Sequence, residues 1–378
     1  MSETYSSLCI LPWLHVYVGV SGSLQSCCIP QIPQKKLSET TPSEFLHHPS
    51  MHSIRRQMLK GQWPEQCLPC KKSEELGLAS FRLGSNQLFK EEFDSPRRNP
   101  SEYFVTLRSV DLRFSNTCNL KCRSCNGFSS SAWRDEHNLI YPDFPVDSKV
   151  LNLDIDLLEK YESLNQCISD SDLSGLKEIS FAGGEPLLIE AQYKFLERLI
   201  QMGRTDIILS YTTNLSRLNY KHWNVLELWQ QFENENLHLS LDGVGEKGEY
   251  IRQGLDWERW LANVQKVRQL LTHVRRDIHF VVSVFNILDL AFHTSEIIRL
   301  NIICSDENGN YPIGFTCLDW PPYLDIQVLP SDLKTEAKNR LYEYIETSRP
   351  CSSLKKALHG IIQYMGREER CADLGASF

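Results

Sequence analysis

The sequence lacks any long hydrophobic run: no apolar stretch approaches the roughly 20 residues that a helix needs to span a bilayer. Its first 20 residues contain no Lys or Arg, so they lack the basic start of a secretory signal. It has no low-complexity tract and no internal repeat. The net charge of −8 over 378 residues gives no excess of basic residues, which nucleic-acid and anionic-membrane binders need. We therefore expect a cytoplasmic globular protein with neither membrane nor nucleic acid as a partner.

Cysteine, by contrast, is abundant. The chain has 13 cysteines, an odd number. In a reducing compartment these residues serve as free thiols, metal ligands or catalytic groups and not as disulfides. The length is sufficient for one large core with an appended domain.

Short apolar runs alternate with longer helical patterns through the middle of the chain. The helical patterns include residues 189–203 and 257–274. Strands that alternate with helices in this way form βαβ units and a parallel sheet, and a spacing of about 30 to 40 residues per unit suits a (β/α) barrel. We therefore predict an α/β protein with a partial, six-unit barrel like that of triosephosphate isomerase. The five runs expected to be strands are residues 109–115, 176–184, 207–214, 237–243 and 278–286.

Three other regions surround or interrupt this pattern. Residues 1–100 are irregular, and alternating Leu14, Val16 and Val18 before a Ser-Gly turn predict a hairpin there. Residues 101–300 contain the barrel. Residues 301–378 form a C-terminal extension that closes it. Further expected features are a helix at 52–59, a linker at 93–102, a lid or insertion at 130–175, and helices at 335–347 and 354–365.

Three cysteines, Cys118, Cys122 and Cys125, follow the first of the five runs in the stretch "SNTCNLKCRSCN". A structural zinc takes four ligands and a disulfide takes two. A cubane [4Fe–4S] cluster normally takes four thiolates, so three would leave one iron free to chelate a small molecule. The alternatives are a zinc site completed by a distant residue, or loop cysteines that bind no metal.

The next run ends in "FAGGEP", which contains Gly183, Gly184 and Glu185. Two glycines allow the backbone to approach a ligand closely. Glu185 offers an acceptor for an ammonium group. The alternative is a tight turn in which Pro186 begins a helix.

Polar residues also end the third and fourth runs: Thr213 and Asn214, then Ser240 and, after a turn, Arg252. Hydroxyl and amide groups at strand ends can contact sugar or carboxylate oxygens, although they also form turns. The planar guanidinium of Arg252 suits a carboxylate. Asp242, beside Ser240, is either part of this site or a plain turn residue.

Taken in this order, the Cys-x3-Cys-x2-Cys and Gly-Gly-Glu-Pro motifs resemble those of the radical SAM superfamily over residues 105–290. The resemblance implies that Cys118, Cys122 and Cys125 hold a [4Fe–4S] cluster that binds S-adenosylmethionine. It also implies that the cofactor is cleaved to a 5′-deoxyadenosyl radical, which abstracts hydrogen from a substrate. One position departs from the family pattern: Ser124 stands where an aromatic residue is usual.

The same resemblance implies roles for the other strand-end residues. Gly183, Gly184 and Glu185 would receive the methionine amino group. Ser240 and Arg252 would contact the ribose and the methionine carboxylate. Val282, on the fifth run, would pack against adenine.

The N-terminal cysteines form a second group. Cys67 and Cys70 have the spacing of a metal knuckle, and a hairpin could bring Cys9 and one of the adjacent pair Cys27 and Cys28 beside them. Adjacent residues of a strand point to opposite faces, so one of that pair should ligate. The residues alone leave zinc and a second [4Fe–4S] cluster as alternatives.

The N-terminal pattern resembles radical SAM proteins of the SPASM/twitch group, which carry an auxiliary [4Fe–4S] cluster. We take Cys9, Cys28, Cys67 and Cys70 as its ligands, with Cys27 in reserve. This assigns residues 1–100 to an auxiliary-cluster region.

By analogy with that group, we expect a ribosomally made peptide as substrate, with cross-linking, oxidation or epimerisation as the outcome. A flavodoxin- or ferredoxin-type protein would supply electrons. Cys317 could return a hydrogen atom to a substrate radical. The alternatives are a small sugar or amino alcohol as substrate, or a non-catalytic scaffold protein whose cysteines bind metal.

Overall fold

A computed structural model describes residues 7–29, 35–98, 105–143, 146 and 168–367. Its centre is a sheet that has nine strands within these residues. Six of the strands are parallel and lie side by side in the order of the sequence. They are β4 (Ser109–Leu112), β6 (Glu178–Phe181), β7 (Ile208–Thr213), β10 (Glu235–Ser240), β12 (Arg275–Val282) and β13 (Ile313–Cys317). All five predicted strands are present, and β13 is a sixth that the apolar pattern did not indicate.

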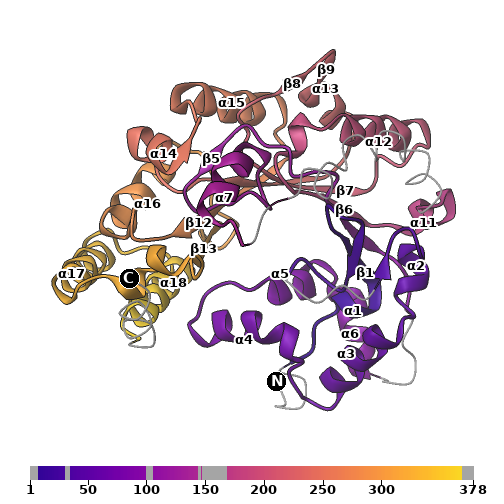
Figure 1. Cartoon of the computed structure of the whole chain (residues 1–378), viewed down its shortest axis with the longest axis horizontal. Coiled ribbons are helices and arrows are strands. Elements are labelled where there is room, and N and C mark those ends of the chain that lie inside the picture. Colours follow the sequence, from indigo (N-terminus) through magenta and orange to yellow (C-terminus); the bar gives the residue numbers. More distant parts are fainter. Residues whose placement is uncertain (1–6, 30–34, 99–104, 144–145, 147–167, 368–378) are drawn as a thin grey trace.

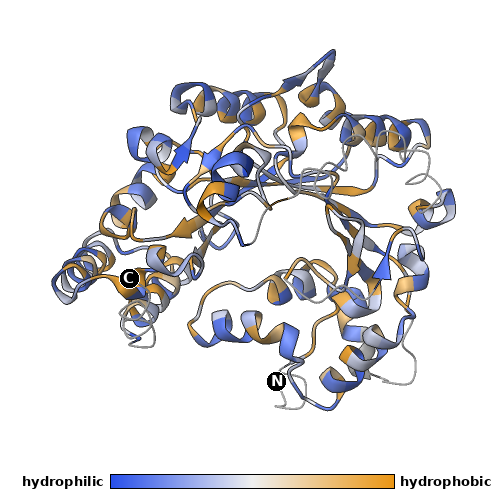
Figure 2. Ribbon diagram, in the orientation of Figure 1, coloured by the Kyte–Doolittle hydropathy of each residue, from blue (hydrophilic) through white to orange (hydrophobic). Residues whose placement is uncertain are grey.

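Helices lie along the outer side of this sheet (Figure 1). They are α11 (Asp170–Gly175), α12 (Glu190–Gln201), α13 (Val225–Trp229), α14 (Gly245–Ile251), α15 (Trp257–Leu270) and α16 (Leu290–Arg299). Figure 2 shows hydrophobic residues concentrated along the strands and hydrophilic residues on the outer sides of the helices. The strands β3 and β13 form the two edges of the sheet and do not pair with each other, so the barrel is partial, as predicted.

The two faces of the sheet differ in polarity. On β10, Leu237 and Leu239 have no exposed surface and face the helices. The alternate residues Asn236, His238 and Ser240 point to the other, concave face and are half-buried. The covered face therefore supplies the hydrophobic core, and the concave face carries polar groups.

The N-terminal residues extend the same sheet. The predicted hairpin is present as β1 (His15–Val18) and β2 (Ser23–Gln25), with β3 (Lys35–Lys36) next to β2. Strand β1 also pairs in parallel with β4, which the sequence did not indicate. The cysteine-rich region and the barrel thus share one sheet.

Several short helices complete the N-terminal region. They are α1 (Leu11–Leu14), α2 (Pro42–Phe45), α3 (Pro49–Leu59), α4 (Leu68–Glu75), α5 (Phe81–Leu88) and α6 (Lys90–Arg98). Helix α3 contains the predicted helix at 52–59. The predicted linker at 93–102 is wrong over 93–98, because Phe93 is buried and fixes α6 against the core. Residues 99–102 lie outside the described residues, as does most of the predicted insertion between α7 (Arg134–Ile140) and α11.

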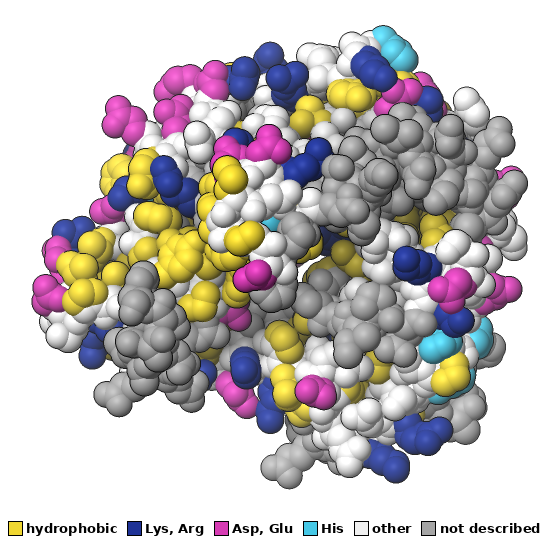
Figure 3. Space-filling model, viewed as in Figure 1, with side chains coloured by type: hydrophobic (Ala, Val, Ile, Leu, Met, Phe, Trp, Pro, Cys, Tyr) yellow, Lys and Arg dark blue, Asp and Glu magenta, His cyan; other side chains and the backbone are white. Residues whose placement is uncertain are grey.

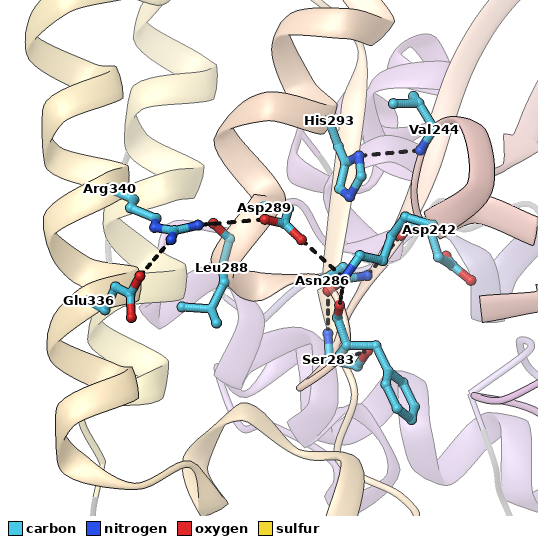
Figure 4. Close-up of polar contacts among 11 residues, drawn as sticks. Asp242, Val244, Ser283, Asn286, Leu288, Asp289, His293, Glu336 and Arg340 are labelled. Atoms are coloured by element: carbon cyan, nitrogen blue, oxygen red, sulfur yellow. Dashed lines mark hydrogen bonds and ion pairs between the residues drawn. The ribbon is translucent and has the colours of Figure 1, made fainter. Parts of the chain in front are cut away.

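The C-terminal helices α17 (Ser331–Ser348) and α18 (Ser352–Met365) confirm the two predicted helices with longer bounds. Arg340 of α17 donates to the carbonyl oxygen of Leu288 at 3.0 Å and forms an ion pair with Asp289 at 3.5 Å, which joins this helix to the end of the barrel (Figure 4). No helix within the described ranges is both long and apolar enough to cross a membrane.

Helix α18 also contacts the N-terminal region directly. A Cβ atom placed on Gly360 would lie 2.1 Å from the carbonyl oxygen of Leu76, just after α4. Only glycine permits this approach. The two ends of the arc therefore meet through helices, although the edge strands do not pair.

We predict that Gly360→Ala lowers the free energy of unfolding by about 1–3 kcal/mol, because the added methyl group forces α18 away from Leu76. Denaturant unfolding measures the change. Alanine is normally the better helix former, so the matched control is Gly84→Ala at an exposed position of helix α5, where no atom lies within 4 Å of the added Cβ. That control should stabilise by up to about 1 kcal/mol. Equal effects of the two substitutions would show that α18 does not press on Leu76.

Candidate functional site

The three-cysteine loop lies beyond the carboxyl end of β4 and is fixed by a short ladder. Its strand β5 (Lys121–Cys122) pairs antiparallel with β11 (Arg252–Gln253), so that Cys122 and Arg252 are direct partners. The Arg123 amide also donates to the carbonyl oxygen of Ile251 at 2.8 Å. The loop after β4 and the segment after α14 therefore form one unit.

The sulfur atoms of this loop receive N–H donors. Cys118 Sγ accepts from the Leu120 amide at 3.5 Å and from Asn214 Nδ2 at 3.8 Å. Arg252 Nη1 donates to Cys122 Sγ at 3.7 Å. Such donors favour thiolates and tune the potential of iron–sulfur clusters. The loop is therefore arranged for sulfur atoms that carry negative charge.

Burial has the opposite effect on these cysteines as long as they bind no metal, because it favours the neutral thiol over the thiolate. It raises the pKa of Cys122 to about 12 and that of Cys125 to about 11, against the positive charge of Arg252, and it also raises the pKa of Cys118. Thiols with a raised pKa stay protonated and neutral. A metal group that binds here must displace those protons.

The spacing of the sulfur atoms bears on which group fits. A zinc ion at about 2.3 Å from each sulfur requires its thiolates to lie within about 4 Å of one another. Within the part of the chain that the structure describes, no set of three cysteines meets the requirement for a single ion. A four-iron cluster binds each thiolate on a separate iron and accepts a wider spacing. The loop is therefore compatible with a cluster that binds each of the three cysteines through a separate iron.

The Gly-Gly-Glu-Pro segment after β6 lies against the start of this loop. The amides of Gly184 and Glu185 donate to the carbonyl oxygens of Ser115 at 3.0 Å and Thr117 at 2.7 Å. A Cβ atom on Gly184 would lie 2.2 Å from the Thr117 oxygen, and Gly183 has a φ of +120°. The sequence predicted that these glycines let backbone approach a ligand; in the structure they let one loop approach another.

Glu185 is buried and its carboxylate joins two strand ends. It accepts hydrogen bonds from Thr213 Oγ1 at 2.6 Å, the Asn214 amide at 2.6 Å and the Leu187 amide at 3.1 Å. Burial raises the pKa of Glu185 to about 7, and the three donors offset part of that effect. Through Asn214, whose side chain reaches Cys118 Sγ, this carboxylate also positions the cysteine loop.

Arg252 is buried and paired. Its Nε lies 3.0 Å from Asp242 Oδ2. Asp242 is fixed in turn, because its Oδ1 accepts from the Val281 amide at 3.0 Å. Its carbonyl oxygen also accepts from Asn286 Nδ2 at 3.0 Å (Figure 4). The sequence left Asp242 undecided between the site and a plain turn, and the structure shows that it orients Arg252.

Two residues that sequence reasoning missed complete this arrangement. Asn119 Oδ1 accepts from Asn214 Nδ2 at 3.2 Å, and Asn119 Nδ2 donates to Ser216 Oγ at 3.0 Å. These bonds join the cysteine loop to the turn after β7. An amide residue inside the Cys-x3-Cys spacing was the available signal for Asn119.

The remaining predicted residues are not all brought to the same face. Ser240 ends β10 on the concave side. Val282 has no exposed surface and shares the covered face with Phe280. Cys317 pairs in register with Val282 and so lies on that covered face too, where burial raises its pKa to about 12. The structure therefore places Val282 and Cys317 away from the concave cavity.

The N-terminal cysteines form a separate group. The electrostatic neighbours of Cys9 include Cys27, Cys67 and Cys70, and burial raises the pKa of Cys9 well above its ordinary value. Cys28, the ligand chosen from the sequence, has Cys27, Asp111 and Arg113 as electrostatic neighbours, and burial raises its pKa to about 12. Cys27, the reserve, is therefore the member of the pair that lies near Cys9.

The fold and the cysteine loop define an α/β domain with three cysteines gathered beyond the end of its first barrel strand. Residues 112–290 match the model of the Radical SAM superfamily. This match supports the expected enzyme over the alternative of a non-catalytic scaffold protein.

Solved structures give weaker likenesses. "Native anSMEcpe with bound AdoMet" is 21% identical with a TM-score of 0.39, and the match covers 65% of this chain and 63% of that one. "Structure of TYW1 with a lysine-pyruvate adduct bound" is 13% identical with a TM-score of 0.33, over 63% and 73% of the two chains. The chain thus spans less than two thirds of the anSMEcpe structure. At these scores neither likeness supports an argument. A comparison with curated proteins found no match.

We predict that Thr213→Val lowers the free energy of unfolding by about 1–3 kcal/mol, because it leaves the buried Glu185 carboxylate and the Leu215 amide each short of one hydrogen bond. Denaturant unfolding measures this change. The matched control is Thr212→Val, on the half-buried opposite face of the same strand, which should change stability by less than about 0.5 kcal/mol. Indistinguishable unfolding of the two variants would contradict the role given to Glu185.

Proposed function

We propose that Cys118, Cys122 and Cys125 hold a [4Fe–4S] cluster with one iron free, at which S-adenosylmethionine binds. The observation that carries this proposal is the convergence on one cysteine loop of groups from separate strand ends. Glu185 and Asn214 come from the ends of β6 and β7, and Arg252 comes from the segment after β10. When bound, the reduced cluster and S-adenosylmethionine supply a 5′-deoxyadenosyl radical that abstracts hydrogen from a substrate.

The residues of the chain have binding and positioning roles in this proposal. Arg252 places a fixed positive charge next to Cys122 and within reach of a carboxylate. The Glu185 carboxylate holds the loops after β4, β6 and β7 in one arrangement, and its remaining capacity as an acceptor suits an ammonium group. Ser240, at the end of β10, offers a hydroxyl to a ribose. The close packing at Gly183 and Gly184 fixes the start of the cysteine loop against the turn after β6.

We also propose an auxiliary [4Fe–4S] cluster bound by Cys9, Cys27, Cys67 and Cys70. The electrostatic coupling of Cys9 to the other three supports this set. Arg82, a neighbour of Cys67 and Cys70, supplies a positive charge beside them. Four thiolates would leave no iron open, which fits electron transfer or a structural role and not substrate binding. A flavodoxin- or ferredoxin-type donor would supply the electrons.

The proposed substrate is a ribosomally made peptide, with a cross-link, an oxidation or an epimerisation as the outcome. Large apolar side chains are exposed at the carboxyl ends of the first and last barrel strands: Leu139 and Ile140 on α7, and Trp320 and Tyr323 after β13. The ring centroids of Tyr141 and Trp320 are 6.1 Å apart, so the two groups form one rim. Hydrophobic side chains gather on this face of the molecule (Figure 3). Such a rim favours an extended ligand over a small sugar or amino alcohol.

We predict that the reduced enzyme transfers deuterium from a labelled peptide substrate into 5′-deoxyadenosine, and that Cys122→Ala forms no 5′-deoxyadenosine because its cluster loses a ligand. Mass spectrometry of 5′-deoxyadenosine measures both results. Exposed Cys304→Ala is the matched control and should behave as the unsubstituted enzyme. Continued formation of 5′-deoxyadenosine by Cys122→Ala would refute the cluster assignment, whereas its formation without label from any peptide would refute the substrate class alone.

We predict that Cys27→Ala lowers the iron content of the anaerobically reconstituted protein from about eight to about four per chain, because the auxiliary cluster loses a ligand. Cys28→Ala should keep about eight. Iron and labile-sulfide analysis measures both. The reverse result would assign Cys28 to the cluster, and about four irons in the unsubstituted protein would remove the auxiliary cluster from the proposal.

A further inference from the structure

A group of side chains outside the cysteine site lies on the concave face of the sheet. His238 of β10 and Asp277 of β12 are direct cross-strand partners. His279 lies two residues beyond Asp277 and therefore on the same face. Within the described ranges, this is the one group of three His, Cys, Asp or Glu side chains that is close enough to hold a metal ion.

The geometry of the group is compact. Its three ligand atoms all lie within 4.8 Å of one another. His238 Nδ1 is 2.8 Å from Asp277 Oδ2, and His279 Nε2 is 3.6 Å from Asp277 Oδ1. The two imidazole rings are stacked, with centroids 4.8 Å apart and planes at 17°. A metal ion at about 2.0–2.2 Å from each ligand separates neighbouring ligand atoms by about 3–3.5 Å, which needs little movement here.

The donor set is selective. Two imidazoles and one carboxylate suit zinc, iron(II) and other divalent transition metals, and do not suit magnesium or calcium, which prefer oxygen. Three protein ligands also leave positions open, as in catalytic and not structural metal sites.

The surroundings favour a cation. The Glu178 carboxylate lies in the same face, buried and accepting from Ser109 Oγ at 2.9 Å and Ser210 Oγ at 2.7 Å. Its negative charge acts on His238. The Asp277 and His279 side chains keep 30% and 51% of their surface exposed, so an ion can reach them.

We propose that His238, Asp277 and His279 bind one divalent transition-metal ion on the concave face of the sheet, with coordination positions left open for a further ligand. Ser240 and His279 are cross-strand partners, so the ion would lie next to the end of β10. There it would take an oxygen donor of the substrate, a carboxylate or a hydroxyl, and fix the substrate close to the nucleotide. That last role rests on the proposed function; the binding of the ion does not.

The test uses zinc as the probe and the reconstituted protein with its cysteine sites filled. Calorimetric titration should show one zinc bound per chain. X-ray absorption at the zinc edge should show nitrogen and oxygen ligands at about 2.0–2.1 Å and no sulfur at about 2.3 Å. Asp277→Asn and His279→Asn should each weaken zinc binding at least about tenfold, with iron and sulfide unchanged.

The matched control is His273→Asn. His273 is also a histidine held by a carboxylate, 2.9 Å from Glu235, but it lies outside the group. This variant should bind zinc as the unsubstituted protein does. Absence of stoichiometric zinc, sulfur in its coordination sphere, or equal affinity in Asp277→Asn would each overturn the proposal. None of these results depends on S-adenosylmethionine cleavage, so the proposed function is tested separately.

Discussion

The buried carboxylate of Glu185 is the contact on which the arrangement of the cysteine loop depends. A carboxylate without water costs several kcal/mol unless donors surround it, and Glu185 takes its donors from Thr213, Asn214 and its own turn. The side chain of Asn214 in turn donates hydrogen bonds to Cys118 Sγ and Asn119 Oδ1, and so fixes the position of the cysteine loop. Three loops that are distant in the sequence are thereby held as one surface, whether or not a cofactor is bound.

A second constraint acts from the other side of the loop. Asp242 holds Arg252, and Arg252 holds Cys122 both through the β5–β11 ladder and through its guanidinium. A buried arginine without a carboxylate would be too costly to retain, so Asp242 is as necessary to the cysteine loop as the arginine itself. The cysteine loop is therefore held between the Glu185 carboxylate, in the turn after β6, and an ion pair after β10.

Much of the barrel fold could be predicted from the sequence. Apolar runs and helical spacing predicted five of the six barrel strands, because buried parallel strands read as continuous hydrophobic segments. Strand β13 was missed because its "IGFTC" is short and includes a glycine. The parallel pairing of β1 with β4 was missed because pairing between distant segments leaves no local pattern. The position of the three cysteines beyond a strand end could be predicted from their spacing and the apolar run before them. The faces of Val282 and Cys317 depend on strand register, which a shift of one residue reverses. The choice between Cys27 and Cys28 depends on the path of the chain after β2, which leaves no local pattern in the sequence.

The contact between Gly360 and Leu76 has a consequence for how the molecule opens. Helix α18 packs on the N-terminal cysteine region at Leu76, and strand β1 of that region pairs with β4 of the barrel. The described N-terminal residues are thus held from two sides by segments that are far apart in the sequence. Local detachment of α18 would therefore uncover the side of this region that carries Leu76 and leave its strands paired with the barrel.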